Sequence, residues 1–152
     1  MRSNVRVAMS DDASYRFRLS VRLRHPTENL AVLSDALGLE PSRSWVAGEG
    51  RTTPRGEPID GVWDHSYSTM PVDVENDDGL EAALERMASF LSGKAQALKR
   101  HTNSGGTINL FIGYFQEGFN SGFSISSELM GKYAAFGIGL DFDIYDQSDE
   151  PA

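Results

Sequence analysis

The clearest hydrophobic pattern in the chain is a strict alternation over residues 15–24. Every second residue in this segment is apolar, and the residues between them are four arginines and one serine. A period of two is typical of a strand with one buried face and one polar face. The segment therefore predicts a strand whose polar face carries Arg16, Arg18, Arg22 and Arg24.

Three other segments repeat their apolar residues at the three- and four-residue spacing of a helix. The first covers residues 28–37 and begins after Thr27, a residue type that often caps helix N-termini. The second is predicted as one long helix over residues 80–100, because acidic residues at its start and basic residues at its end suit the helix dipole. The third follows Ser126 or Ser127 as its N-cap.

Short apolar runs predict four more strands, over residues 62–67, 107–115, 123–125 and 138–145. A glycine-rich turn between the second and third of these runs predicts a hairpin. In the last run we expect an inward set and an outward set, which are Ile138, Leu140, Phe142 and Ile144, and Asp141, Asp143 and Tyr145.

Strands with one apolar face and helices with one apolar stripe pack as two layers. The sequence therefore predicts an α+β two-layer sandwich, with a mixed, mostly antiparallel sheet and helices on one face. A strand–helix–strand order at both ends favours a ferredoxin-like arrangement, in which the first and last strands are neighbours. We expect one domain over residues 14–146, a flexible tail over 1–13 and a polar tail over 147–152.

The composition narrows the classes of function. The net charge of −8 argues against nucleic-acid and anionic-membrane partners, although residues 1–56 hold nine arginines against six acidic residues. The absence of cysteine excludes a disulfide scaffold, a thiolate nucleophile and cysteine-ligated metals. No apolar run has the length of a signal-peptide core or a transmembrane helix, so we expect a cytoplasmic protein.

Three motifs occur in a fixed order along the chain. Residues 37–49 contain L-G-L-E-P and W-V-A-G, residues 62–66 hold a second tryptophan, and residues 136–145 end in D-F-D-I-Y. In this order they resemble the bacterial domain-of-unknown-function 4279 family over residues 15–146. The resemblance implies a single bacterial α+β domain, and it transfers no activity, cofactor or catalytic residue.

Two places are candidate binding sites. The first is the polar strand face, where aromatic residues from other strands are expected beside the arginines. The second is the segment over residues 41–60, which lacks any periodicity and is long for a loop in a compact domain. The candidate ligand- or partner-binding residues are Arg16, Arg18, Arg22, Arg43, Trp45, Arg51, Trp63, Phe111 and Tyr145.

Each candidate has a structural interpretation beside the functional one. The strand arginines can bind an anion or an acidic partner, or they can pair with Asp141 and Asp143 from a neighbouring strand. Trp45 can cover a ligand, or it can plug the edge of the core. In both cases the structural interpretation is the favoured one.

No motif points to catalysis, a metal or a cofactor. The three histidines show no metal-ligand spacing, and Asp64 and His65 are expected on opposite faces of a strand. No serine lies in a nucleophile elbow, and the glycine-rich segments lack a phosphate-loop pattern. We therefore predict no catalytic residue, no metal site and no cofactor.

The favoured hypothesis is a non-enzymatic binding protein that uses the open sheet face or residues 41–60. One version is an immunity-type protein that neutralises a basic toxin, because complementary charge speeds encounter. The alternative is a small-molecule or anion-binding domain, or an enzyme, that uses Arg16, Arg18, Arg43 and Trp45. A third hypothesis is a homodimer joined through the open sheet.

Overall fold

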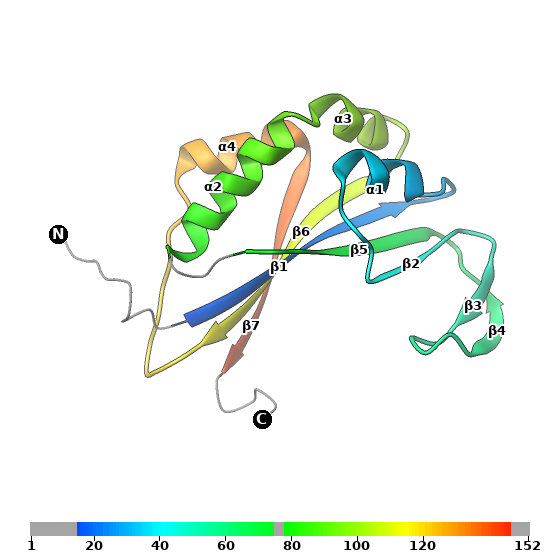
Figure 1. The fold of residues 1–152 in the computed structure, drawn as a ribbon, viewed down its shortest axis with the longest axis horizontal. Coiled ribbons are helices and arrows are strands. Elements are labelled where there is room, and N and C mark those ends of the chain that lie inside the picture. Colours follow the sequence, from blue (N-terminus) through cyan, green and yellow to red (C-terminus); the bar gives the residue numbers. More distant parts are fainter. Residues whose placement is uncertain (1–14, 75–77, 147–152) are drawn as a thin grey trace.

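The computed structural model describes residues 15–74 and 78–146, so both predicted tails lie outside the described residues. A five-stranded sheet carries four helices on one face, and a separate two-stranded hairpin projects from one end (Figure 1). In chain order the elements are β1 (Tyr15–His25), α1 (Ala31–Leu37), β2 (Arg43–Trp45), β3 (Gly50–Thr52), β4 (Pro58–Val62), β5 (Ser66–Val72), α2 (Gly79–Ser92), α3 (Ala95–Asn103), β6 (Thr107–Gln116), α4 (Ser127–Phe136) and β7 (Ile138–Asp146). The predicted α+β class is confirmed.

The alternation in β1 separates the two sides of the sheet. Its apolar residues Phe17, Leu19, Val21 and Leu23 are at most 3% exposed and lie in the core beneath the helices. Buried side chains of β6 and the apolar stripe of α2 complete this core. The arginines of β1 therefore lie on the helix-free side, as the sequence predicts.

The order of the sheet is β2-β5-β1-β6-β7, and β1 pairs antiparallel with both β5 and β6. The prediction that the first and last strands are neighbours is wrong, because β7 pairs only with β6 and runs parallel to it. The chain leaves β6, passes through α4 and adds β7 on the outer side of β6. β6 therefore separates β1 from β7.

The predicted hairpin after β6 is also wrong. Residues 117–126 form no strand, and the ring of Phe123 instead packs against Tyr114 and stacks on Phe142 of β7 at 5.3 Å. The far half of β7 extends beyond the helices, so Phe142 is 37% exposed and Ile144 is 61% exposed. Of the four residues that were expected to face inward, one is buried, Ile138, and one is half-buried, Leu140.

Two of the predicted helices differ in their bounds. The long helix is interrupted at Gly93. The amides of Gly93 and Lys94 donate to carbonyls three residues earlier, in place of the four-residue spacing of an α-helix, and this closes α2 before α3 begins. Glycine is a weak helix former, which makes it a natural point for this break. α1 starts at Ala31 and not at residue 28, and Thr27 does not cap it.

The predicted cap of the last helix is confirmed. The Ser126 hydroxyl accepts a hydrogen bond from the Leu129 amide, and Gly137 ends α4 in the left-handed conformation at φ 75°. The segment over residues 41–60 is not a structureless loop. It supplies β2 to the edge of the main sheet and contributes β3 and most of β4 to the projecting hairpin. The strand predicted over 62–67 lies further along the chain, as β5.

Candidate functional site

The side of the main sheet opposite the helices, here called the open face, carries the β1 arginines. Cross-strand register places Arg22 between Thr69 of β5 and Asn109 of β6. Arg16 lies opposite Phe115, which in turn lies opposite Tyr145 of β7. Residues paired in register share a face, so four strands contribute to one continuous surface with β1 near its middle.

Each of these arginines contacts an aromatic ring. The Arg22 guanidinium carbon lies 3.7 Å from the centre of the Phe111 ring, which is close stacking. Arg16 and Arg18 lie over Phe115 at 5.6 and 5.4 Å. Cation–π contacts hold guanidinium groups in place without neutralising their charge.

The predicted pairing of the β1 arginines with Asp141 and Asp143 is wrong. In the register of the sheet these aspartates lie opposite Phe111 and Gly113 of β6, one strand away from β1. No ion pair joins them to a β1 arginine within the described residues. Arg16 instead forms an ion pair with Glu117, just after β6.

A tryptophan cluster extends the open face at its other end. The rings of Trp45 and Trp63 stack at 3.9 Å with an angle of 11° between their planes, and Tyr67 lies 4.7 Å from Trp45. Arg43 lies over Trp45 at 5.0 Å, and Arg51 lies over Trp63 at 5.5 Å. Trp45 is paired in register with Tyr67, on the face away from the core, so the prediction that it plugs the core edge is wrong.

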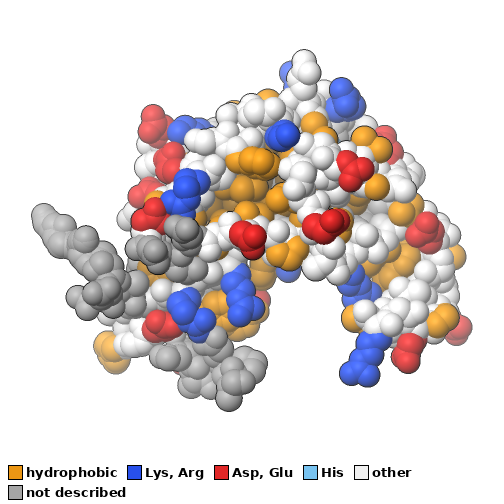
Figure 2. Space-filling model, viewed as in Figure 1, with side chains coloured by type: hydrophobic (Ala, Val, Ile, Leu, Met, Phe, Trp, Pro, Cys, Tyr) orange, Lys and Arg blue, Asp and Glu red, His pale blue; other side chains and the backbone are white. Residues whose placement is uncertain are grey.

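The predicted site residues are thus gathered on one side of the molecule, but in two groups. Arg16, Arg18 and Tyr145 lie toward the start of β1, whereas Arg43, Trp45 and the hairpin lie toward its end. Arg22 lies six residue steps along β1 from Arg16, a distance of about 20 Å. In Figure 2 the outline of the molecule is hollowed between the hairpin and the opposite end of the sheet, with Lys and Arg side chains on both sides of the hollow.

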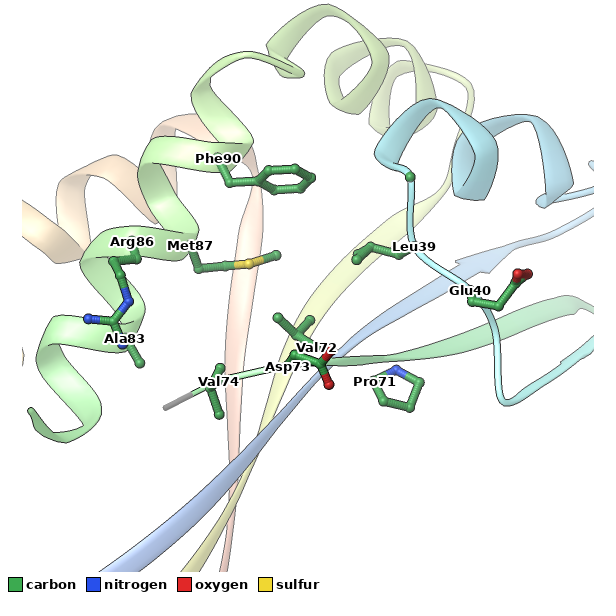
Figure 3. Close-up of a pocket in the computed structure, with 11 residues that line it drawn as sticks. Leu39, Glu40, Pro71, Val72, Asp73, Val74, Ala83, Arg86, Met87 and Phe90 are labelled. Carbon is green, nitrogen blue, oxygen red and sulfur yellow. The ribbon is translucent and has the colours of Figure 1, made fainter. Parts of the chain in front are cut away.

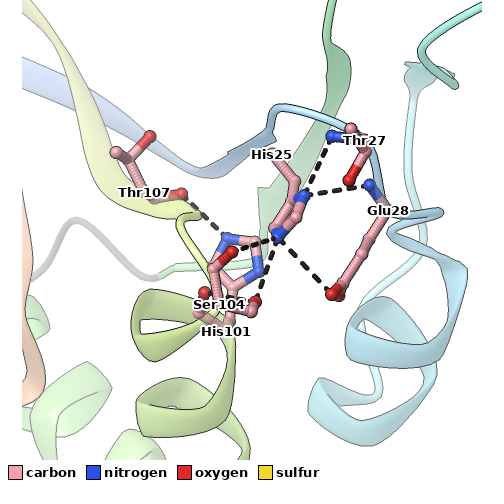
Figure 4. A network of polar contacts seen from close by, with 6 residues as sticks. All are labelled: His25, Thr27, Glu28, His101, Ser104 and Thr107. Atoms are coloured by element: carbon pink, nitrogen blue, oxygen red, sulfur yellow. Dashed lines mark hydrogen bonds and ion pairs between the residues drawn. The ribbon is translucent and has the colours of Figure 1, made fainter.

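Two buried histidines form a polar cluster that no pattern along the sequence predicts. The rings of His25 and His101 lie 5.7 Å apart and are 3% and 6% exposed (Figure 4). Nδ1 of His25 accepts hydrogen bonds from the amides of Thr27 and Glu28 at 3.0 and 2.9 Å, so its Nε2 carries the proton and donates to Ser104. His25 therefore joins the end of β1, the turn before α1 and the end of α3.

The environment of the second histidine, His101, favours its neutral form. Nε2 of His101 lies 3.1 Å from the carbonyl oxygen of Thr107, and burial lowers the pKa of His101 below its usual range. The nearby His25 lowers this pKa further, and Glu28 and the backbone carbonyls of Thr107 and Arg24 oppose the shift. The unfolded chain then binds a proton more readily than the folded one.

We predict that the free energy of unfolding falls as the pH drops below about 6.5, the usual pKa of histidine, toward the lowered pKa of His101. Urea unfolding at several pH values measures this slope. His101→Gln should flatten it, since an amide can still donate to Thr107 but does not titrate. The comparison variant His65→Gln, at a half-buried turn position outside the cluster, should keep the native slope. Equal slopes in all three proteins would contradict the prediction.

Asp64 and His65 are not on opposite faces of a strand, as the sequence analysis expected. They lie in the turn between β4 and β5, and Oδ1 of Asp64 contacts Nδ1 of His65 at 2.5 Å. This hydrogen bond lowers the pKa of the exposed Asp64 carboxyl. No group of three or more His, Asp or Glu residues converges on a metal-sized site within residues 15–74 and 78–146.

Comparison with known proteins gives a family and no closer relative. The family model for a domain of unknown function, DUF4279, matches residues 15–147. No curated protein and no solved structure matches the chain. Within the described residues, no helix is both long enough and apolar enough to cross a membrane.

Proposed function

We propose that this chain, which belongs to the DUF4279 family, is a non-enzymatic binding domain whose open face takes an extended acidic segment of a protein partner. The spacing of its cations carries the proposal. Arg18 and Arg43 are separated by four residue steps along the strand direction and by two inter-strand spacings, which is about 16 Å. Such a separation is too large for one small anion, and it suits a polypeptide that runs along β1.

The chemistry of the face supports a protein partner. Arginine and aromatic residues dominate the binding energy of protein interfaces. Arg18 and Arg22 form no ion pair with any other described residue. A carboxylate of the bound protein could therefore pair with either guanidinium group without displacing an existing ion pair. The expected contacts are therefore charge-assisted hydrogen bonds from guanidinium groups to Asp or Glu.

Two other partners fit this face less well. Single-stranded nucleic acid needs aromatic rings with accessible faces, whereas Phe111 lies beneath Arg22 and the two tryptophan rings stack on each other. A second copy joined face to face would bring the β1 arginines of both copies together, and like charges repel. A heterologous acidic partner avoids both problems.

The toxin-neutralising version of this function stays a hypothesis. The acidic total charge suits a basic toxin, whereas the arginines of the open face suit an acidic surface. If the partner is a toxin, its contact region should be acidic at this face. We also propose, as part of this function, that the protein is bacterial and acts in the cytoplasm.

A matched pair of triple variants tests the proposal. Arg18, Arg22 and Arg43 become Gln in the first, and Lys94, Lys99 and Arg100 become Gln in the second, so both lose three positive charges. The tagged proteins are used to capture partners from host lysate with and without nuclease treatment, and any captured protein is purified and titrated against each of them. We expect the native chain and the second variant to bind alike, and the first to bind at least about tenfold more weakly.

Three outcomes would contradict the proposal. Equal binding by both variants would place the contact elsewhere. A partner that is lost on nuclease treatment would indicate nucleic acid. The absence of any partner that binds the native chain would favour the small-molecule alternative.

A further inference from the structure

On the helix side of the sheet, the helix layer leaves an apolar groove of about 830 Å³ (Figure 3). α1 packs against α3, and α2 packs against α4, so the end of β5 is uncovered between α1 and α2. The apolar lining comes from three places: Leu39 after α1, Val72 and Val74 at the end of β5, and Met87 and Phe90 on α2. Figure 2 shows hydrophobic side chains at the surface in the same region, between the two helices.

The groove has the size and chemistry of a ligand site. Small-molecule pockets commonly enclose about 300–1,000 Å³ and have apolar walls with a few polar groups. Leu39, Val72 and Val74 are half-buried, and Phe90 is 42% exposed, so an occupant would remove apolar surface from water. That transfer favours a complex with an apolar ligand.

The charge at the rim selects the occupant. The carboxylates of Glu40 and Asp73 lie on the side of the groove away from Phe90 (Figure 3), and neither has an ion-pair partner among the described residues. Arg86, the cation of the lining, forms an ion pair with Asp78 at 2.6 Å. The rim therefore presents net negative charge, which favours a cation and disfavours a carboxylate.

We propose that this groove binds a small cationic amphiphile, with its apolar part on Val72, Val74, Met87 and Phe90 and its ammonium group at the acidic rim, beside Asp73. The site lies on the opposite side of the sheet from the open face. Its occupant has the opposite charge to the acidic partner proposed there. The two proposals can therefore fail independently.

Isothermal titration with two ligands of equal chain length tests the charge selection. Decylamine is positively charged at neutral pH and decanoate is negatively charged, and both are used below the concentration at which they form micelles. We expect decylamine to bind at least about tenfold more tightly than decanoate, a difference of ~1.4 kcal/mol. NMR shifts of the methyl groups of Val72, Val74 and Met87 should follow decylamine binding.

Variants separate the groove from general charge attraction. Replacing Glu40 with Gln and Asp73 with Asn together should abolish the preference for decylamine. Asp35→Asn, an exposed α1 acid outside the groove, should retain it. Phe90→Ala should weaken the binding of both ligands. Val32→Ala, which truncates an exposed apolar side chain outside the groove, should leave the binding of both unchanged.

Several results would overturn the proposal. These are no binding of decylamine, equal affinity for the two ligands, a preference that survives removal of both carboxylates, or methyl shifts outside the groove. Binding of a basic amphipathic peptide in place of decylamine would assign the groove to a protein partner, and would also overturn it.

Discussion

Replacing Gly106 with alanine should lower the free energy of unfolding by about 3 kcal/mol, since overpacking and a lost buried hydrogen bond each cost about 1–3 kcal/mol. A Cβ atom at this position would lie 2.3 Å from Cε1 and Nε2 of the His101 ring, far inside contact distance. The ring is only 6% exposed, and its Nε2 hydrogen-bonds to Thr107. The backbone cannot retreat easily either, because the Gly106 amide donates to the carbonyl of His101 at 2.9 Å.

Chemical denaturation of Gly106→Ala and Gly131→Ala measures this effect against a matched control. Gly131 lies within α4, and a Cβ there would meet no atom within 4 Å. Alanine is the better helix former, so this control should gain about 0.5–1 kcal/mol. The same substitution should therefore have opposite signs at the two positions.

A double variant assigns the cause of the loss at Gly106. His101→Ala removes the ring that the new methyl group would strike, so the Gly106→Ala substitution should cost much less in that background. A cost that is unchanged without the ring would show that the glycine is needed for another reason. A Gly106→Ala protein as stable as the native one would contradict the packing argument itself.

The sequence predicted well the features that depend on neighbouring residues. The alternation over β1 gave the correct faces because a strand has a fixed period of two. Ser126 marked the start of α4 because capping is a local interaction. β2, β3 and β4 were missed because strands of three to five residues are too short to show a period.

Features that depend on pairing between distant segments were not predictable in this way. The choice of Phe111 and Phe115 over Asp141 and Asp143 as contacts of the arginines follows from the position of β6 between β1 and β7. The contact of His25 with His101 needs the end of β1 to meet the end of α3. No spacing along the chain indicates either arrangement.

The same sheet order gives the site a centre and a rim, and this leads to the largest expected effect on binding. Arg22 is half-buried, stacks on Phe111 at 3.7 Å and has an Nε atom without a hydrogen-bond partner. Arg18 is exposed and lies 5.4 Å from the centre of the Phe115 ring. Binding energy concentrates in arginines that are central and desolvated, whereas exposed rim charges contribute little.

We therefore expect Arg22→Ala to weaken binding of the proposed acidic partner at least about 30-fold, or ~2 kcal/mol. Arg18→Ala should weaken this binding less than about fivefold. Each variant removes one positive charge, so long-range attraction changes equally and the difference reports on position. Arg22→Lys should resemble Arg22→Ala, because an ammonium keeps the charge but loses planar stacking and bidentate contact. Titration of the captured partner measures all three, and near-ultraviolet circular dichroism checks that each variant is folded. Equal losses at both positions, or full rescue by lysine, would mean that the open face acts only through diffuse charge, and the extended, position-specific contact proposed here would be wrong.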